Sequence, residues 1–90
     1  MTEIRTIKLK NKLGMHARAA AALVKVAQQF KAEIYLERNG QTANGKSILG
    51  ILTLACPKGG MLTIKAEGID ALTAIEAIVK LVENKFGEAS

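Results

Sequence analysis

Apolar and polar residues alternate along four stretches of the chain, and this period of two predicts β-strands. The four stretches are residues 3–10, 32–38, 41–44 and 61–67. The last is the clearest, because Leu62, Ile64 and Ala66 share one face. Between the second and third stretches, Asn39 and Gly40 both tolerate positive φ and predict a hairpin turn. The return strand of this hairpin holds few apolar residues, so we expect it at an edge of the sheet.

Apolar residues three and four positions apart predict three helices. The helices cover residues 17–30, 48–55 and 71–86. The first has Leu23 and Val24 on its apolar stripe, and the last has Ile75 and Ile78. The short middle stretch would also suit a buried strand, but the preceding Ser47 is a good N-cap and favours a helix.

This order of elements, β-α-β-β-α-β-α, predicts an α+β fold with helices on one face of an antiparallel sheet. A chain of 90 residues has room for one core, so residues 1–90 form a single domain. The pattern alone does not determine the order of the strands within the sheet.

Composition narrows the class of protein. No apolar run approaches the roughly 20 residues that span a membrane, and the first residues lack the apolar core of a signal peptide. The single cysteine excludes an internal disulfide and fits a reducing compartment, so we expect a cytoplasmic protein. With one cysteine and one histidine far apart in sequence, we expect no metal site.

The formal charge of +5 suits either nucleic acid or acidic protein surfaces. The lysines are spread along the chain, and only Phe30, Tyr35 and Phe86 are aromatic. A stacking platform for bases is therefore poorly supported, and we expect protein partners and no nucleic acid.

His16, the only histidine, lies between Gly14 and an alanine-rich helix, which places it at a helix N-terminus. The free N–H groups there attract anions, and the guanidinium of Arg18 suits phosphate oxygens. A nucleophilic nitrogen beside an anion site indicates a histidine that holds phosphate. The alternatives are a simple helix cap for His16 and a solvated side chain for Arg18.

Two motifs resemble those of a known family. The segment from Gly14 to Arg18 resembles the active-site signature of HPr, the histidine-containing phosphocarrier of the bacterial phosphotransferase system. The segment from Asn39 to Gly50 resembles that family's regulatory-serine region. The resemblance covers nearly the whole chain. It implies an open-faced two-layer β-sandwich, with a four-stranded antiparallel sheet in the order 1-4-2-3 covered on one face by three helices.

The resemblance also implies roles for single residues. His16 would accept a phosphoryl group on Nδ1, giving a pros-phosphohistidine, and Arg18 would stabilise it. The donor would be phospho-enzyme I, and the acceptors would be sugar-specific IIA components. Such a carrier is no enzyme with turnover of its own, needs no cofactor, and is expected to be a monomer. Ser47 would be a regulatory phosphorylation site for an HPr kinase/phosphorylase, with a transcriptional regulator as a further partner.

Partner docking is expected beside the active centre. Arg18 would lie at the rim of an apolar patch that the resemblance places there, with core positions as the alternative for each member. The docking residues are Met15, Ala21, Lys25, Lys46, Leu49 and Leu52.

The chain departs from the family pattern at one position. The family usually has proline directly after the arginine, whereas this chain has Ala19. Alanine is comfortable at a helix start and regains a backbone N–H. The competing functions are a regulatory protein-binding module that acts through Ser47, in a nitrogen-related or catabolite-control branch, and a basic nucleic-acid binder.

Overall fold

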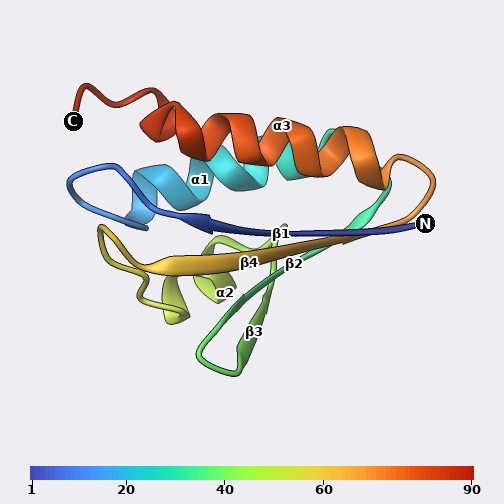
Figure 1. The fold of residues 1–90 in the computed structure, drawn as a ribbon, viewed down its shortest axis with the longest axis horizontal. Helices are drawn as coiled ribbons and strands as arrows, with labels where there is room; N and C mark the ends of the chain where they lie inside the picture. Colours follow the sequence, from blue (N-terminus) through green and yellow to red (C-terminus); the bar gives the residue numbers. More distant parts are fainter.

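The four predicted strands form one sheet in the computed structural model, which describes residues 1–90 (Figure 1). The strands are β1 (Thr2–Lys8), β2 (Glu33–Arg38), β3 (Gln41–Asn44) and β4 (Met61–Glu67). Every pair is antiparallel and the order is β1-β4-β2-β3, so the expected order is confirmed. The predicted edge position of β3 is also confirmed. Asn39 and Gly40 have φ values of 52° and 82° in the hairpin turn between β2 and β3.

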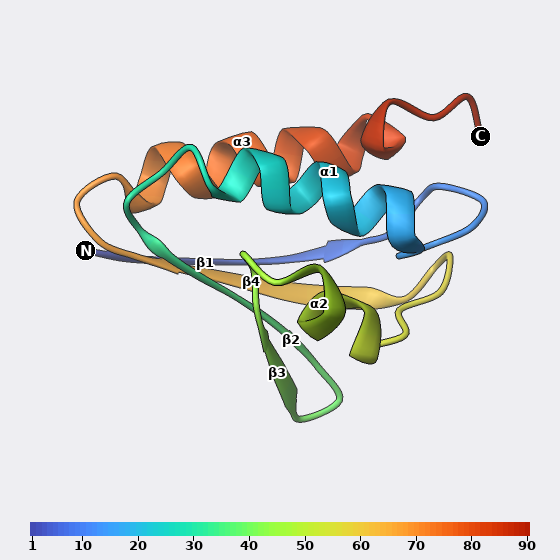
Figure 2. The same ribbon diagram turned by 180° about the vertical axis from the view of Figure 1, so that it is seen from behind.

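Two long helices lie side by side over one face of the sheet, as Figures 1 and 2 show from opposite sides. The helices are α1 (Ala17–Ala27), α2 (Ile48–Thr53) and α3 (Ala71–Glu83), followed by the short 3₁₀ turn η1 (Lys85–Gly87). The short helix α2 packs against α1 and β3. None of these helices is long and apolar enough to cross a membrane.

Both long helices end earlier than the apolar pattern predicted. At Gln29 and Phe30 the N–H groups bond to the carbonyl three residues back, as in a 3₁₀ turn, and no longer to the carbonyl four residues back. Gln29 donates to the carbonyl of Val26, and Phe30 donates to that of Ala27. In α3 the regular helix ends at Glu83. The apolar pattern continues past Ala27 and past Glu83, because apolar residues beyond both points still pack against the core. Periodicity indicates which residues are buried, but it does not indicate where the helical hydrogen bonds stop.

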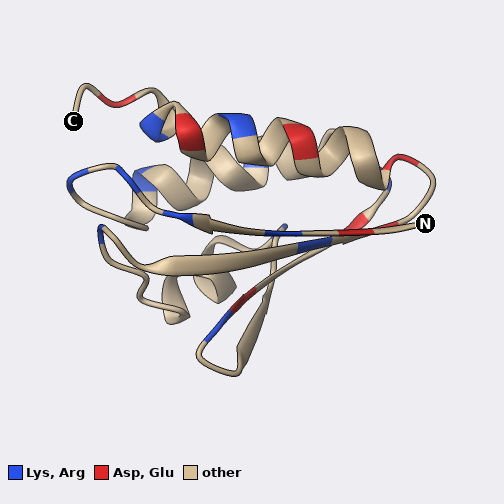
Figure 3. Ribbon diagram, in the orientation of Figure 1, with Lys and Arg blue, Asp and Glu red and all other residues tan.

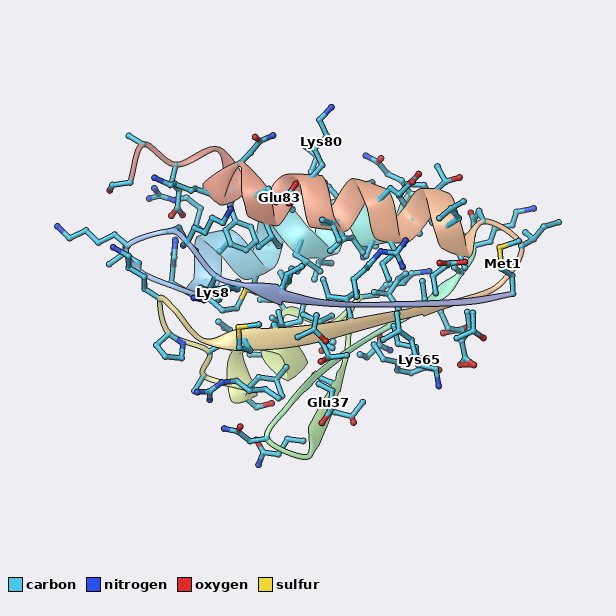
Figure 4. The ribbon with its side chains drawn as sticks, viewed as in Figure 1. Met1, Lys8, Glu37, Lys65, Lys80 and Glu83 are labelled. Atoms are coloured by element: carbon cyan, nitrogen blue, oxygen red, sulfur yellow. The ribbon has the colours of Figure 1, made fainter.

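The core is aliphatic and lies between the sheet and the helices. Fully buried side chains come from alternate positions of β2 and β4 and from one stripe of each long helix. They include Leu23, Ile34, Leu36, Leu62, Ile64, Ile75, Ile78 and Val82. The opposite face of α3 is polar, and Lys80 points away from the sheet in Figure 4. Ile4 on β1 is exposed although it is apolar. The imperfect alternation of this strand therefore did not predict which of its side chains face the core.

Asp70 occupies the N-cap position of α3 but does not cap this helix with its side chain. Its carboxylate instead accepts hydrogen bonds from the N–H groups of Lys31 and Ala32, at 2.9 and 2.8 Å. The N–H of Lys31 is the main cause that lowers the pKa of Asp70, an effect that the smaller desolvation of the carboxyl opposes only in part. Asp70 therefore ties the start of α3 to the segment that leads into β2.

Candidate functional site

The loop before His16 is shaped by Gly14. This residue has a φ of +63°, and an added Cβ would lie 2.7 Å from the carbonyl oxygen of Cys56. The next N–H, from Met15, donates to that same oxygen at 2.9 Å. Because the loop rests directly on the backbone of residues 56–58, only glycine allows this approach. Gly14 thus fixes the point from which His16 enters α1.

His16 lies at the N-terminus of α1, as predicted, where it is the N-cap and has an extended backbone. Its Nδ1 accepts a hydrogen bond from the N–H of Arg18 at 3.3 Å. An accepting Nδ1 carries a lone pair and no proton, so in the neutral ring the proton belongs on Nε2. The side chain is partly buried, with 24% of its surface exposed. The lone pair of Nδ1 therefore faces the N-terminus of α1.

The other ring nitrogen of His16 contacts a carboxylate that sequence reasoning missed. Nε2 donates to Oε2 of Glu88, which lies 72 residues further along the chain. Figures 1 and 2 both place the C-terminal segment at the end of the molecule that carries the loop between β1 and α1. No local motif surrounds Glu88, so only the packing of the C-terminal segment reveals its position.

Asn11 joins Glu88 to the loop. Its buried side-chain amide donates to the carbonyl of Gly14 at 2.7 Å and to Oε1 of Glu88 at 3.0 Å. Sequence analysis had assigned Asn11 no role in the site. One amide thus holds both the loop that presents His16 and the carboxylate that contacts its ring.

The pKa of Glu88 is lowered from its ordinary value of 4.5. Burial by itself raises this pKa, but the hydrogen bonds from Asn11 and His16, with the charges of His16 and Arg18, outweigh it. Glu88 is consequently ionised at neutral pH and faces His16 as a carboxylate.

Basic residues surround the site. Arg18 is exposed at the second position of α1. It lines a hollow of about 300 Å³ together with Lys12, Leu13, Glu88 and Ser90. Figure 3 shows further Lys and Arg residues at this end of the molecule, on the loops that flank the start of α1. The structure therefore places Arg18 in the first turn of α1, as the sequence predicted, with its side chain exposed.

Ser47 caps α2, as predicted. Its Oγ accepts a hydrogen bond from the N–H of Gly50 at 3.0 Å. Gly50 makes this approach easy, since an added Cβ there would lie 3.1 Å from Oγ of Ser47. Ser47 is half-buried, so its hydroxyl lies near the surface while it caps α2.

The residues expected to dock partners differ in how far they are exposed to solvent. Ala21, Lys25 and Leu49 are exposed, and Leu49 exposes 77% of its surface. Lys46 and Leu52 are half-buried, and Nζ of Lys46 donates to the carbonyl of Phe30.

The placement of Met15 in the exposed patch was wrong. Met15 is only 6% exposed and belongs to the core, because its N–H donates to the carbonyl of Cys56 and holds the loop against the backbone there. Leu13, which sequence analysis did not select, is 67% exposed beside Arg18. The loop thus points Leu13 outward and Met15 inward.

Comparison with known proteins defines the class. The sequence model of the family described as "PTS HPr component phosphorylation site" matches residues 4–84. The phosphocarrier protein HPr of Neisseria meningitidis is 40% identical over 92% of this chain and 93% of its own length. The phosphocarrier protein NPr of Shewanella violacea is 43% identical, with both chains covered completely.

The fold comparison agrees. The crystal structure of HPr-C-His from Thermoanaerobacter tengcongensis matches with a TM-score of 0.94 and 43% identity, and covers 98% of this chain and 99% of that one. The chain therefore belongs to the HPr family of phosphocarrier proteins of the phosphotransferase system.

Proposed function

We propose that this chain accepts a phosphoryl group on Nδ1 of His16 from phospho-enzyme I and passes it to sugar-specific IIA components. The observation that carries the proposal is the orientation of Nδ1, which accepts the N–H of Arg18 at the start of α1. Phosphoryl oxygens on Nδ1 would meet the same N–H and the positive end of the helix dipole.

The surroundings of His16 suit a carrier. Phosphoryl transfer depends mainly on positioning and on neutralising the phosphoryl oxygens. Arg18 and Lys12 line the same hollow as Glu88, whose carboxylate contacts the ring. Ala19 occupies the position that is usually proline in the family, and its N–H is one of the free donors of the first helical turn. Since the site is partly open, a partner protein completes it and supplies the second reacting group.

Exposed apolar residues in the loop before α1 and on α2, which packs against α1, support docking of the partners. Leu49 on α2 and Leu13 in the loop are the most exposed of them. We propose that they bind enzyme I and the IIA components together with Ala21, Lys25, Lys46 and Leu52. Apolar patches with a basic rim are typical of interfaces with acidic proteins.

The direct test is phosphorylation by a heterologous enzyme I with phosphoenolpyruvate and Mg²⁺, followed by intact mass. We expect a gain of one phosphate that is labile to acid, stable to base and absent from His16→Ala. Arg18→Ala should be phosphorylated about 10²-fold more slowly, which is the scale for removing one charge-stabilising group. Lys80→Ala, on the outer face of α3 (Figure 4), is the control for general loss of positive charge. A phosphate that persists in His16→Ala would refute the proposal.

Ser47 supports a second, compatible function as a regulatory phosphorylation site. Its hydroxyl is near the surface, and the exposed Leu49 lies two residues further on. A phosphate on Ser47 would place about two negative charges on the proposed docking surface. We expect an HPr kinase with ATP to modify the parent chain and not Ser47→Ala. If His16→Ala kept every activity of the parent chain, the purely regulatory function would replace the carrier function.

A further inference from the structure

We infer that Glu88 is a positioning residue for phosphoryl transfer, which holds the Nε2 proton of His16 and stabilises the positive charge that the ring gains. This inference rests on the proposed function of His16 as phosphoryl acceptor. It is motivated by the contact of the Glu88 carboxylate with the ring nitrogen opposite to the one that faces α1.

The two ring nitrogens of His16 have opposite partners. Nδ1 receives a proton donor, the N–H of Arg18, whereas Nε2 meets an acceptor, the carboxylate of Glu88. Both contacts favour the same neutral tautomer, with the proton on Nε2 and the lone pair on Nδ1. The surroundings thus select Nδ1 as the nucleophile before any partner binds.

The charge balance of the transfer explains why a carboxylate is useful. The lone pair of Nδ1 forms the new N–P bond, while the bond from phosphorus to the donor nitrogen of enzyme I breaks and its electron pair stays on that nitrogen. The Nε2 proton does not move. The imidazole ring of His16 therefore changes from neutral to cationic as the N–P bond forms. Onward transfer returns the electron pair to Nδ1 and makes the ring neutral again.

A carboxylate behind a reacting histidine stabilises such a charge, as the aspartate of a serine-protease triad does. Glu88 contacts the ring on the side away from the incoming phosphoryl group. It can thus stabilise the cation while the N–H groups of α1 and Arg18 meet the phosphoryl oxygens. Because its contact with the ring is on the Nε2 side, Glu88 acts on the reacting nitrogen through His16.

The backbone holds Glu88 in this position. Lys85 and Phe86 have φ values of 56° and 58°, and Gly87 follows with 80°. A left-handed conformation is unfavourable for a residue with a side chain. Such a turn persists when other contacts stabilise it, and here these are the packing of Phe86 against the core and the hydrogen bond from Asn11 to Glu88. The turn redirects the chain from the end of α3 toward His16.

The first test uses ¹⁵N chemical shifts of the His16 ring, recorded on the unphosphorylated full chain at a pH where the ring is neutral. We expect a pyridine-type Nδ1 and a pyrrole-type Nε2 in the parent chain. Glu88→Ala should move both shifts toward an average of the two tautomers, and Glu88→Gln, which keeps an acceptor, should restore them. Glu83→Ala removes an exposed carboxylate of α3 and should change neither shift.

The second test measures phosphorylation of each variant by enzyme I as a function of variant concentration. We expect kcat to fall about tenfold in Glu88→Ala with little change in KM, with an intermediate value for Glu88→Gln and the parent value for Glu83→Ala. An increase in KM alone would overturn the inference, because it would make Glu88 a docking residue. Unchanged ring shifts together with unchanged kcat would overturn it as well.

The two tests separate this inference from the proposed function. If the parent chain shows the expected ring shifts but gains no phosphate, the carrier function fails, and the role of Glu88 in transfer fails with it. If the chain gains phosphate on His16 and Glu88→Ala behaves as the parent, only the role of Glu88 fails.

Discussion

The carboxylate of Glu88 accepts a hydrogen bond from Nε2 of His16, across 72 residues of sequence. The same carboxylate accepts the side-chain amide of Asn11, which also holds the loop before His16. The C-terminal segment and the loop between β1 and α1 are therefore one unit at the site, although they lie at opposite ends of the sequence.

This unit should respond to acid. The pKa of Glu88 is lowered by folding, so its ionised form stabilises the folded state above the unfolded pKa. That contribution is lost as the pH falls through the lowered, folded pKa. We expect the ¹³C shift of the Glu88 carboxyl to titrate with a midpoint below 4.5. In Asn11→Ala, which removes one donor to the carboxylate, the midpoint should move upward. A midpoint at or above 4.5 in the parent chain would contradict the contact.

Gly14→Ala should destabilise the fold more than a comparable change elsewhere. The new Cβ would lie within 3 Å of backbone atoms of three residues, in addition to occupying a positive φ. We expect a loss of about 2–4 kcal/mol in the free energy of unfolding, as strain and overpacking combine. Gly40→Ala is the matched control, because its φ is +82° but its surroundings are open. Urea unfolding of both variants gives the comparison, and equal losses would show that the contact with residues 56–58 is unimportant.

Ser47→Ala should remove the cap of α2. We expect a loss of roughly 1 kcal/mol in the free energy of unfolding, the usual cost of losing an N-cap side chain. Ser47→Asp keeps an acceptor for the N–H of Gly50 and should retain most of the stability. Thermal unfolding followed by circular dichroism measures both variants. If Ser47→Asp were as unstable as Ser47→Ala, the acceptor would not be the stabilising feature of this residue.

Leu49 and Ile51 on α2 should behave in opposite ways. Ile51 is fully buried, so Ile51→Ala should cost about 2–5 kcal/mol in the free energy of unfolding. Leu49 is largely exposed, and Leu49→Ala should change stability by less than about 0.5 kcal/mol. If Leu49 docks partners as proposed, its variant should raise the KM for phosphorylation by enzyme I at unchanged stability. A parent-like KM would remove Leu49 from the docking surface.

Local pattern was sufficient for most of the fold. The alternation in β2 and β4, the turn at Asn39 and Gly40, and the cap at Ser47 each depend on residues close in sequence, and the structure contains all of them. The positions of His16 and Arg18 at the start of α1 were likewise predictable, because glycine followed by an alanine-rich helix determines that boundary. The strand order followed from the family resemblance and not from the pattern.

The rest depended on contacts between distant segments. Met15 is apolar in a loop, and only the hydrogen bond to Cys56 decides that it is buried while Leu13 is exposed. Asp70 precedes α3 and is of a residue type that often caps helices. Its two carboxylate oxygens instead accept hydrogen bonds from the N–H groups of Lys31 and Ala32, in the segment before β2.

The sequence by itself thus determined most of the secondary structure and the position of His16 at a helix N-terminus, because periodicity and capping are local properties of the chain. Only the tertiary structure decided which groups face the ring of His16. Asn11 and Glu88 come together because the left-handed turn after α3 directs the chain back over the loop, and no local pattern records such a meeting.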